Sequence, residues 1–301
     1  MNDDPLAPHV ILVRGVGDVG SAVAHRLYRA GYAVTIHDDT RPATTRRAMA
    51  FTDAIFEGRA CLDGVTAMRV DSAPEATDLL VARAAIPVLA AALATTLSAL
   101  APTVLIDARM RKRAHPEDQR APAPLVIGLG PNFVVGSNVD LAIETSWEAL
   151  GAIIRAGETL PLAGEPRALG RHGRERFVYA PHAGTFRTTL RLGVRFQEGE
   201  EVARLDGTPL VAPLGGTWRG LTHDGVSVSV DTKVIEVDPR GELLVMGIGE
   251  RPGHIAELPP RKRACERGAV HLRRARGGED AVVEEAKREG SLPSYTRLNS
   301  Q

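Results

Sequence analysis

The first residues whose spacing suggests chemistry are three glycines between an apolar run and a helix-like segment. Residues 15–20 read GVGDVG, which fits the pattern G-x-G-x-x-G. In such a loop Gly15 permits a tight turn, Gly17 lets the backbone approach a phosphate, and Gly20 lets the helix pack closely. The N-terminus of the following helix would offer N–H groups to an anion. The segment predicts a phosphate-binding loop, and a glycine turn used only for packing is the alternative.

An acidic residue follows at a distance that suits ribose recognition. Asp38 lies 18 residues after Gly20, where a second strand should end, and could accept hydrogen bonds from ribose hydroxyls. Asp18 weakens this interpretation, because its carboxylate could take the amides that a phosphate needs. Nearby basic residues would instead suit an added phosphate. They are Arg41, Arg46 and Arg47.

A second group of charged residues follows the apolar run 103–106. Asp107, Arg109 and Lys112 supply a carboxylate, a guanidinium and an ammonium group. The carboxyl ends of parallel strands form the ligand crevice of an open sheet, so these groups could hold an anionic ligand there. Gly128 and Gly130 follow another apolar run and could line the same crevice. A solvated loop with structural ion pairs, and a plain tight connection, are the alternatives.

The elements that would position these residues alternate along the first half of the chain. Apolar runs predict strands at 9–13, 33–36, 65–70, 86–89, 103–106 and 125–129. Helical spacing predicts helices at 18–30, 44–56, 78–84 and 90–100. This alternation is typical of a parallel sheet with helices on both faces. We therefore expect a Rossmann-like nucleotide-binding domain over residues 1–172.

The next part of the chain contains an internal repeat. Residues 180–187 match residues 212–219 at an offset of 32, and further matches follow at the same offset. The repeat predicts a small β-sandwich over 173–250, a barrel-sandwich hybrid that resembles biotinyl or lipoyl domains. The junction at 205–209 lacks the lysine that such domains modify, which excludes covalent biotin or lipoate. Residues 251–301 are rich in arginine and predict a poorly ordered basic tail.

Composition excludes several function classes. Lys plus Arg equals Asp plus Glu at 37 each, so nucleic acid is an unlikely partner. The start of the chain is acidic and unlike a secretion signal. No apolar stretch reaches the roughly 20 residues that a membrane helix needs, so a cytoplasmic location is expected. The two cysteines, Cys61 and Cys265, and the histidines show no metal-ligand spacing, and no metal site is predicted.

Several motifs together resemble a known family. They occur in the order RGVGD (14–18), RR (46–47), IPVL (86–89), VLIDARM (104–110), PLVIGLGP (124–131) and VDPRG (237–241). This order, over residues 9–250, resembles the YqeB-like accessory proteins of the selenium-dependent molybdenum hydroxylase system. The chain departs from that pattern at residues 146–149, which read SWEA where such proteins commonly carry Arg-Gly-His.

The resemblance implies an accessory factor that matures or inserts the cofactor of a molybdenum hydroxylase. Together with the glycine loop, it implies a nucleotide or phosphate-bearing ligand, with a molybdopterin nucleotide or NAD(P) as the candidates. A molybdenum hydroxylase client, or another cofactor-maturation protein, would be the partner. An NAD(P)-dependent oxidoreductase and a non-catalytic nucleotide sensor are the alternative functions. Neither the residues nor the resemblance identifies a reaction or a catalytic residue.

Overall fold

The computed structural model describes residues 9–111, 115–161, 166–241 and 246–257, which belong to one compact unit, Met1–Glu257. Lys112 and almost all of the predicted basic tail lie outside these ranges. The tail interval nevertheless begins with structure. Helix α5 spans Glu250–Ile255, and the side chain of Ile255 is buried in the core that also contains helix α1.

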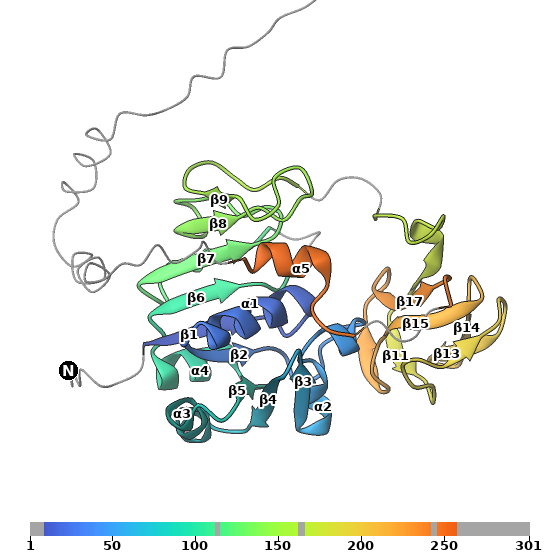
Figure 1. The fold of residues 1–301 in the computed structure, drawn as a ribbon, viewed down its shortest axis with the longest axis horizontal. Helices are drawn as coiled ribbons and strands as arrows, with labels where there is room; N and C mark the ends of the chain where they lie inside the picture. Colours follow the sequence, from blue (N-terminus) through green and yellow to red (C-terminus); the bar gives the residue numbers. More distant parts are fainter. Residues whose placement is uncertain (1–8, 112–114, 162–165, 242–245, 258–301) are drawn as a thin grey trace, which may run out of the picture. The chain divides into compact units, whose positions relative to one another are not determined.

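The first part of the chain forms a nine-stranded sheet with the strand order β3-β4-β5-β2-β1-β6-β7-β8-β9 (Figure 1). Its strands are β1 (Val10–Arg14), β2 (Ala33–His37), β3 (Arg59–Leu62), β4 (Val65–Val70), β5 (Ile86–Leu89), β6 (Val104–Asp107), β7 (Leu125–Leu129), β8 (Leu141–Ile143) and β9 (Ile153–Ile154). Its helices are α1 (Asp18–Arg29), α2 (Asp53–Glu57), α3 (Ala73–Ala82) and α4 (Leu93–Leu100), with a 3-10 turn η1 (Arg47–Met49).

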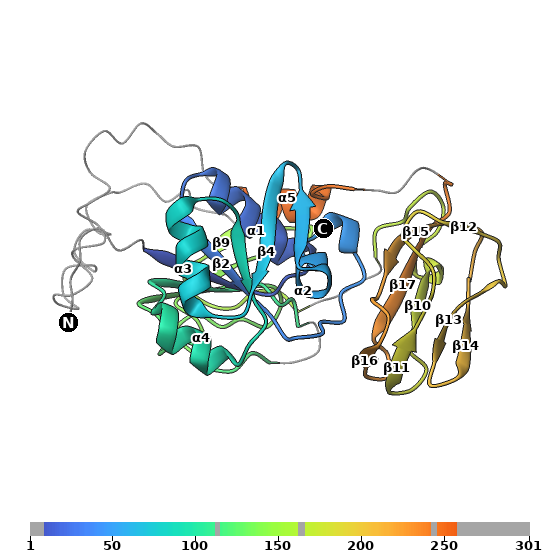
Figure 2. The same ribbon diagram turned by 90° about the horizontal axis from the view of Figure 1, so that it is seen from below.

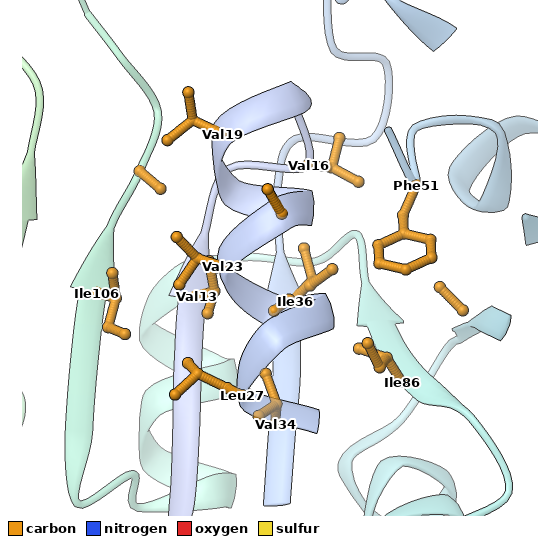
Figure 3. Packing of buried hydrophobic residues seen from close by; sticks show 14 of the residues in the cluster. Val13, Val16, Val19, Val23, Leu27, Val34, Ile36, Phe51, Ile86 and Ile106 are labelled. Atoms are coloured by element: carbon orange, nitrogen blue, oxygen red, sulfur yellow. The ribbon is translucent and has the colours of Figure 1, made fainter. Parts of the chain in front are cut away.

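Both faces of this sheet are covered, which explains the continuous apolar sequence of its central strands. Successive side chains of a strand point to opposite faces. In β1, Val13 packs in the core beneath α1, whereas Leu12 packs in the core that contains residues of α3 and α4. Figure 3 shows Val23 and Leu27 of α1 lying over β1 and β2. The carboxyl end of β1 is thereby fixed beside the start of α1.

The predicted fold class is wrong in its first part, because the sheet is mixed rather than parallel. Strand β3 pairs antiparallel with β4, and β9 pairs antiparallel with β8. A two-residue turn joins β3 to β4, with Asp63 at φ 44° and Gly64 at φ 77°. Such a turn can only connect antiparallel neighbours. The sequence analysis included β4 but missed β3, and so missed the hairpin.

The second part of the chain folds into two four-stranded antiparallel sheets (Figure 2). One has the order β10-β17-β15-β12 and the other β14-β13-β11-β16. The bounds are β10 (Phe177–Tyr179), β11 (Gly184–Arg187), β12 (Arg195–Phe196), β13 (Glu201–Leu205), β14 (Thr208–Val211), β15 (Gly216–Leu221), β16 (Val226–Val228) and β17 (Lys233–Asp238), preceded by a 3-10 turn η2 (Arg174–Arg176). Phe186 of β11 and Trp218 of β15 are fully buried in the core that both sheets share.

The repeat relates strands of these two sheets. At the offset of 32, β11 corresponds to β15 and β13 corresponds to β17. The first repeat places β11 and β13 side by side in one sheet, and the second places β15 and β17 side by side in the other. The second part of the fold-class prediction is also corrected. The described strands pair within two separate sheets, and this pairing gives no clear evidence for a biotinyl- or lipoyl-like barrel-sandwich hybrid.

Candidate functional site

The glycine loop is closed by a side chain of the protein itself. Asp38, directly after β2, accepts the backbone N–H of Val16 through Oδ2 at 2.7 Å and that of Asp39 through Oδ1 at 2.8 Å. Burial raises the pKa of the Asp38 carboxyl above its usual value, although both N–H donors oppose the rise. The predicted ribose ligand Asp38 therefore serves as a local acceptor for the loop.

Two of the three loop glycines are required by close backbone packing. A Cβ on Gly20 would overlap the carbonyl group of Gly15. A Cβ on Gly15 would lie 2.9 Å from the backbone of Ala108, directly after β6. Gly17 is different, because a Cβ there would meet nothing within 4 Å. The loops after β1 and β6 thus touch each other, which fits the packing alternative of the sequence analysis.

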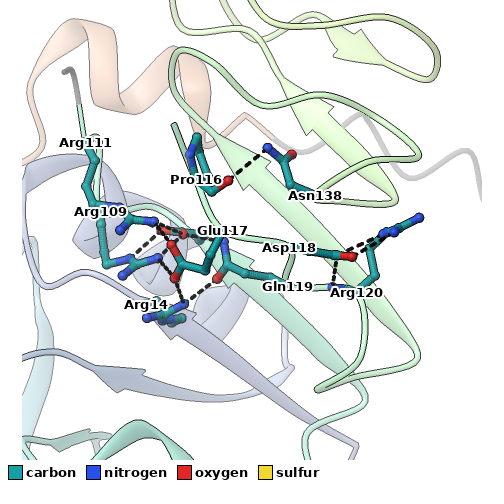
Figure 4. A network of polar contacts seen from close by, with 10 residues as sticks. Arg14, Arg109, Arg111, Pro116, Glu117, Asp118, Gln119, Arg120 and Asn138 are labelled. Atoms are coloured by element: carbon teal, nitrogen blue, oxygen red, sulfur yellow. Dashed lines mark hydrogen bonds and ion pairs between the residues drawn. The ribbon is translucent and has the colours of Figure 1, made fainter. Parts of the chain in front are cut away.

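Asp107 and Arg109 belong to a polar network at the carboxyl ends of β1 and β6 (Figure 4). Arg109 donates to the buried Asp107 carboxylate through Nε at 2.9 Å and Nη2 at 2.5 Å. Gln119 Nε2 donates to the same carboxylate at 2.7 Å. Arg14, the last residue of β1, contacts Glu117 and Gln119. The predicted pair is thus brought together, with its hydrogen-bonding groups directed at residues of this chain.

The remaining predicted site residues are placed less favourably for a ligand. A Cβ on Gly128 would overlap the ring of Phe133, so this glycine serves packing. Gly130 adopts φ +127°, a conformation that requires glycine, and lies against the side chain of Met110. Lys112 lies outside the described residues.

A larger concentration of charge surrounds Glu236 of β17 and includes Asp18 of the glycine loop. We call it the Glu236 cluster, and its members are Asp18, Arg46, Arg176, Arg219, Lys233 and Glu236. The Glu236 side chain is 0% exposed. Its carboxylate contacts four cations: Arg46 Nε at 3.0 Å, Arg176 Nη1 at 2.7 Å, Arg219 Nε at 3.0 Å and Lys233 Nζ at 2.8 Å.

Arg46 connects this carboxylate to the glycine loop. Its Nη1 lies 2.8 Å from Oδ2 of Asp18, the first residue of α1, while Nε and Nη2 face Glu236. Burial opposes ionisation of Asp18, but Arg46 outweighs it and lowers the pKa of the Asp18 carboxyl. Burial likewise opposes ionisation of Glu236, yet Lys233 and Arg46 hold the pKa of its carboxyl well below the usual value. Both acids are therefore charged at neutral pH.

The cluster has more positive than negative charge. Its six members carry four cations and two carboxylates, and the buried Asp238 beside Arg219 offsets part of this positive excess. Burial and the neighbouring Arg46 lower the pKa of the Arg219 guanidinium, the shift expected where cations crowd together. Side chains of Arg46 and Lys233 are about a quarter exposed, at 27% and 25%, so solvent reaches the cluster.

Most of this site was not predicted from the sequence. Arg46 was predicted only as a basic residue that follows Asp38, and Asp18 as a residue of the glycine loop. Glu236, Arg176 and Arg219 were not among the predicted site residues. One signal was present: Glu236 is a charged residue between the apolar Ile235 and Val237 of β17. A charge in such a run is expected to have a buried partner. The sequence could not show that its partners come from three other segments.

Comparison with known proteins gives one relative of the same kind as the resemblance above. No protein-family model matches the chain. The chain is 35% identical over 241 residues to "Uncharacterized protein YqeB" of Escherichia coli (strain K12), which covers 79% of the chain and 44% of that protein. The chain is thus YqeB-like and spans less than half the length of this relative. The relative's name states no activity and gives no support to a molybdenum hydroxylase role.

Similarity to solved structures is weak. An aspartoacylase family protein of Mesorhizobium loti is 10% identical, with 76% of this chain and 84% of that chain covered and a TM-score of 0.23. A succinylglutamate desuccinylase of Silicibacter sp. TM1040 is 11% identical, with 77% and 85% covered and a TM-score of 0.24. The ectoine utilization protein EutE (DoeB) of Ruegeria pomeroyi is 15% identical, with 77% and 86% covered and a TM-score of 0.22. At these scores the likeness assigns neither fold nor activity.

The function predicted from the sequence is wrong. It named a molybdenum cofactor maturation factor, with an NAD(P)-dependent oxidoreductase or a nucleotide sensor as alternatives. No family model matches the chain and the name of its relative states no activity, so neither comparison supports these functions. The glycine loop is also held by Asp38 and Asp18 of this chain, where a phosphate was expected. The molybdenum, selenium, Rossmann-like and nucleotide-binding assignments are therefore not retained.

Two further expectations, on the cofactor and on the partner protein, are tested neither by the contacts nor by the comparisons. The cofactor and partner-protein expectations stay predictions from the sequence alone. Among the described helices, none combines the length and the apolar character needed to cross a membrane.

Proposed function

We propose that this protein binds a small carboxylate-bearing anion at the Glu236 cluster. One observation carries the proposal: four cations surround one fully buried carboxylate, and Asp18 is the second acid of the cluster. An excess of positive charge in a half-buried place is costly unless an anion offsets it. An anionic ligand would supply that offset.

The guanidinium groups of the cluster favour a carboxylate as the ligand group, and Arg46 shows the geometry of such a contact. Its guanidinium already takes Glu236 in a two-pronged contact, with Nε at 3.0 Å and Nη2 at 3.3 Å. Planar guanidinium groups match carboxylates in this way. Three cations of the cluster have partly exposed side chains: Arg46 at 27%, Arg219 at 16% and Lys233 at 25%. Arg46 already bridges Asp18 and Glu236, so Arg219 and Lys233 are the two side chains whose substitution tests contact with a ligand from solvent.

The test is the thermal stability of the full chain in malonate, succinate and sulfate, with sodium chloride matched for ionic strength. A ligand at about 100 times its dissociation constant adds roughly 2.7 kcal/mol of apparent stability. We expect saturable stabilisation by a dicarboxylate, and its loss in Arg219→Gln and Lys233→Gln. Arg204→Gln is the matched control, since Arg204 is an exposed arginine of β13 paired with Glu201. Stabilisation that is absent, or equal in all three variants, would overturn the proposal.

A second readout separates binding from folding. Arg219→Gln removes one of the crowded cations, so we expect the unliganded variant to be at least as stable as the wild type at low salt. A variant that loses both stability and ligand response would indicate that Arg219 only supports the fold.

The cytoplasmic location expected from the sequence is kept as part of this proposal, and cell fractionation of the native protein tests it.

A further inference from the structure

A second cluster of side chains, independent of the Glu236 cluster, combines one imidazole and two carboxylates. It consists of Asp53 and Glu57 of α2 and His223, which follows β15. One ligand atom from each residue lies within 4.8 Å of the other two. His223 Nε2 is 2.7 Å from Asp53 Oδ1. We call these three residues the His223 site.

The local structure explains why the three side chains converge. Asp53 and Glu57 are four residues apart on one helix, so their side chains share a face. The ring of His223 stacks on Phe56 of the same helix, with 3.7 Å between ring centroids and 15° between planes. Near His223, the backbone N–H of Leu221 donates to Thr45 O at 2.8 Å, which joins the end of β15 to the segment before α2. The imidazole is therefore held in place by contacts other than those with the carboxylates.

The charge and exposure of the His223 site suit a cation. Two carboxylates face one guanidinium: Arg47 donates to Asp53 through Nε at 2.8 Å and approaches Glu57 through Nη2 at 3.1 Å. With a neutral imidazole, the formal net charge is minus one. His223 is buried, while the side chain of Glu57 is 58% exposed. The site thus has a fixed inner ligand and an outer side that is open to water.

We propose that the His223 site binds a divalent transition-metal ion of the zinc type. One imidazole nitrogen and two carboxylate oxygens are ligands that Zn²⁺ accepts, and three protein ligands leave a position for water or a substrate group. No metal site was predicted from the sequence, because neither the two cysteines nor the other histidines show the spacing of metal ligands. His223 is 170 residues from Asp53, a separation that no spacing rule covers.

Arg47 is the competitor for the metal ion. Its guanidinium now balances the same two carboxylates, and a metal ion must displace it from them. Both of the contacts with Asp53 use Oδ1 of that carboxylate. Removing the guanidinium charge should therefore strengthen metal binding, in contrast to the effect of removing a ligand. His223→Ala then distinguishes a metal site from a surface that merely attracts cations, because it removes a ligand and leaves the charge of both carboxylates unchanged.

The experiment is a calorimetric titration of the full chain with Zn²⁺, repeated with Co²⁺ and visible absorption to report nitrogen and oxygen ligation. We expect one site per chain, at least tenfold weaker in His223→Ala and in Asp53→Asn, and at least tenfold tighter in Arg47→Gln. His172→Gln is the matched control, because His172 contacts Glu175 at 3.2 Å in an exposed pair. Its affinity should equal that of the wild type.

The opposite results would contradict the proposal. It fails if the wild type shows no saturable Zn²⁺ site, or if His172→Gln weakens binding while His223→Ala does not. Arg47→Gln keeps the proposal testable if the ligand variants misfold, because it retains all three ligands and must gain affinity. A folded Arg47→Gln protein with no gain would also overturn the site.

Discussion

The carboxylate of Asp38 receives the backbone N–H of Val16 at 2.7 Å, across the turn that follows β1. The acceptor comes from the end of β2, the strand next to β1 in the sheet. Because the two strands run parallel, the residue after β2 lies beside the residues after β1. The glycine loop is thus closed by a side chain that its own sheet brings to it.

This contact predicts different results for two substitutions of Asp38. Asp38→Ala leaves the N–H of the buried Val16 without its acceptor, and we expect a loss of about 1–3 kcal/mol in urea unfolding. Asp38→Asn keeps an oxygen for Val16 and removes a desolvated charge, so its loss should be smaller. Because the pKa of Asp38 is raised in the folded state, this group lowers stability as pH rises from its usual value of 3.8 through the folded pKa. Equal losses in both variants would contradict the assignment.

The loop glycines predict a sharper contrast. Gly20→Ala places a methyl group against the Gly15 carbonyl, so the start of α1 must shift. Overpacking of this kind costs about 1–3 kcal/mol. Gly17→Ala meets nothing within 4 Å at an ordinary φ of −65°, and we expect a change within about 0.5 kcal/mol. Urea unfolding of both proteins checks this. A phosphate-binding loop would reverse the importance of the two glycines for function.

Much of the first sheet could be predicted because its strands are apolar on both faces. The predicted strands at 86–89 and 125–129 match β5 and β7, and the predicted helix at 18–30 nearly matches α1. The single helix predicted at 44–56 is wrong, because the chain forms η1 and then the short helix α2. Phe51, between them, is fully buried and leads the chain into the core. Strand β3 was missed because its side chains are mostly exposed.

The site was harder to predict because its residues are distant in the sequence. Asp107 and Arg109 were predicted together and do contact each other, since only one residue separates them. Arg46 and Glu236 are 190 residues apart, and their contact depends on how two segments fold. A glycine pattern also has two physical causes, room for a ligand and room for backbone packing. The pattern alone does not distinguish them, whereas the position of each absent Cβ does.

In the polar network at the carboxyl ends of β1 and β6, we expect the loss of two carboxylates to affect stability differently. The side chain of Asp107 is 2% exposed and that of Glu117 is 48% exposed, although Arg109 contacts both. Asp107→Asn removes the buried carboxylate from its pair with Arg109, and breaking a buried pair costs about 3–5 kcal/mol. Glu117→Gln should cost about 0–1 kcal/mol, because solvent screens exposed pairs.

Urea unfolding at low and high salt measures this difference. The effect of Glu117→Gln should shrink further in 1 M salt, whereas that of Asp107→Asn should persist. If the two substitutions cost the same, the burial of Asp107 would not be what makes its pair with Arg109 more important than that of Glu117.

Glu236 predicts how the stability of the protein depends on pH. The pKa of its carboxyl lies well below the usual 4.5 in the folded state, because Lys233 and Arg46 outweigh the effect of burial. A lowered acid pKa contributes stability that is fully present above the unfolded pKa and is lost as pH falls toward the folded pKa. We therefore expect the free energy of unfolding to fall as pH drops below about 4.5.

Glu236→Gln tests whether the Glu236 carboxylate causes this dependence of stability on pH. At pH 7 it leaves the cations of the Glu236 cluster without their central partner, and we expect a loss of about 3–5 kcal/mol. Below pH 4.5 its stability should fall less steeply than that of the wild type, and a slope remains because Asp18 and Asp107 also have lowered pKa values. Glu201→Gln, in an exposed pair with Arg204, is the control and should follow the wild-type curve. Parallel acid curves for Glu236→Gln and the wild type would show that Glu236 does not link the cluster to stability.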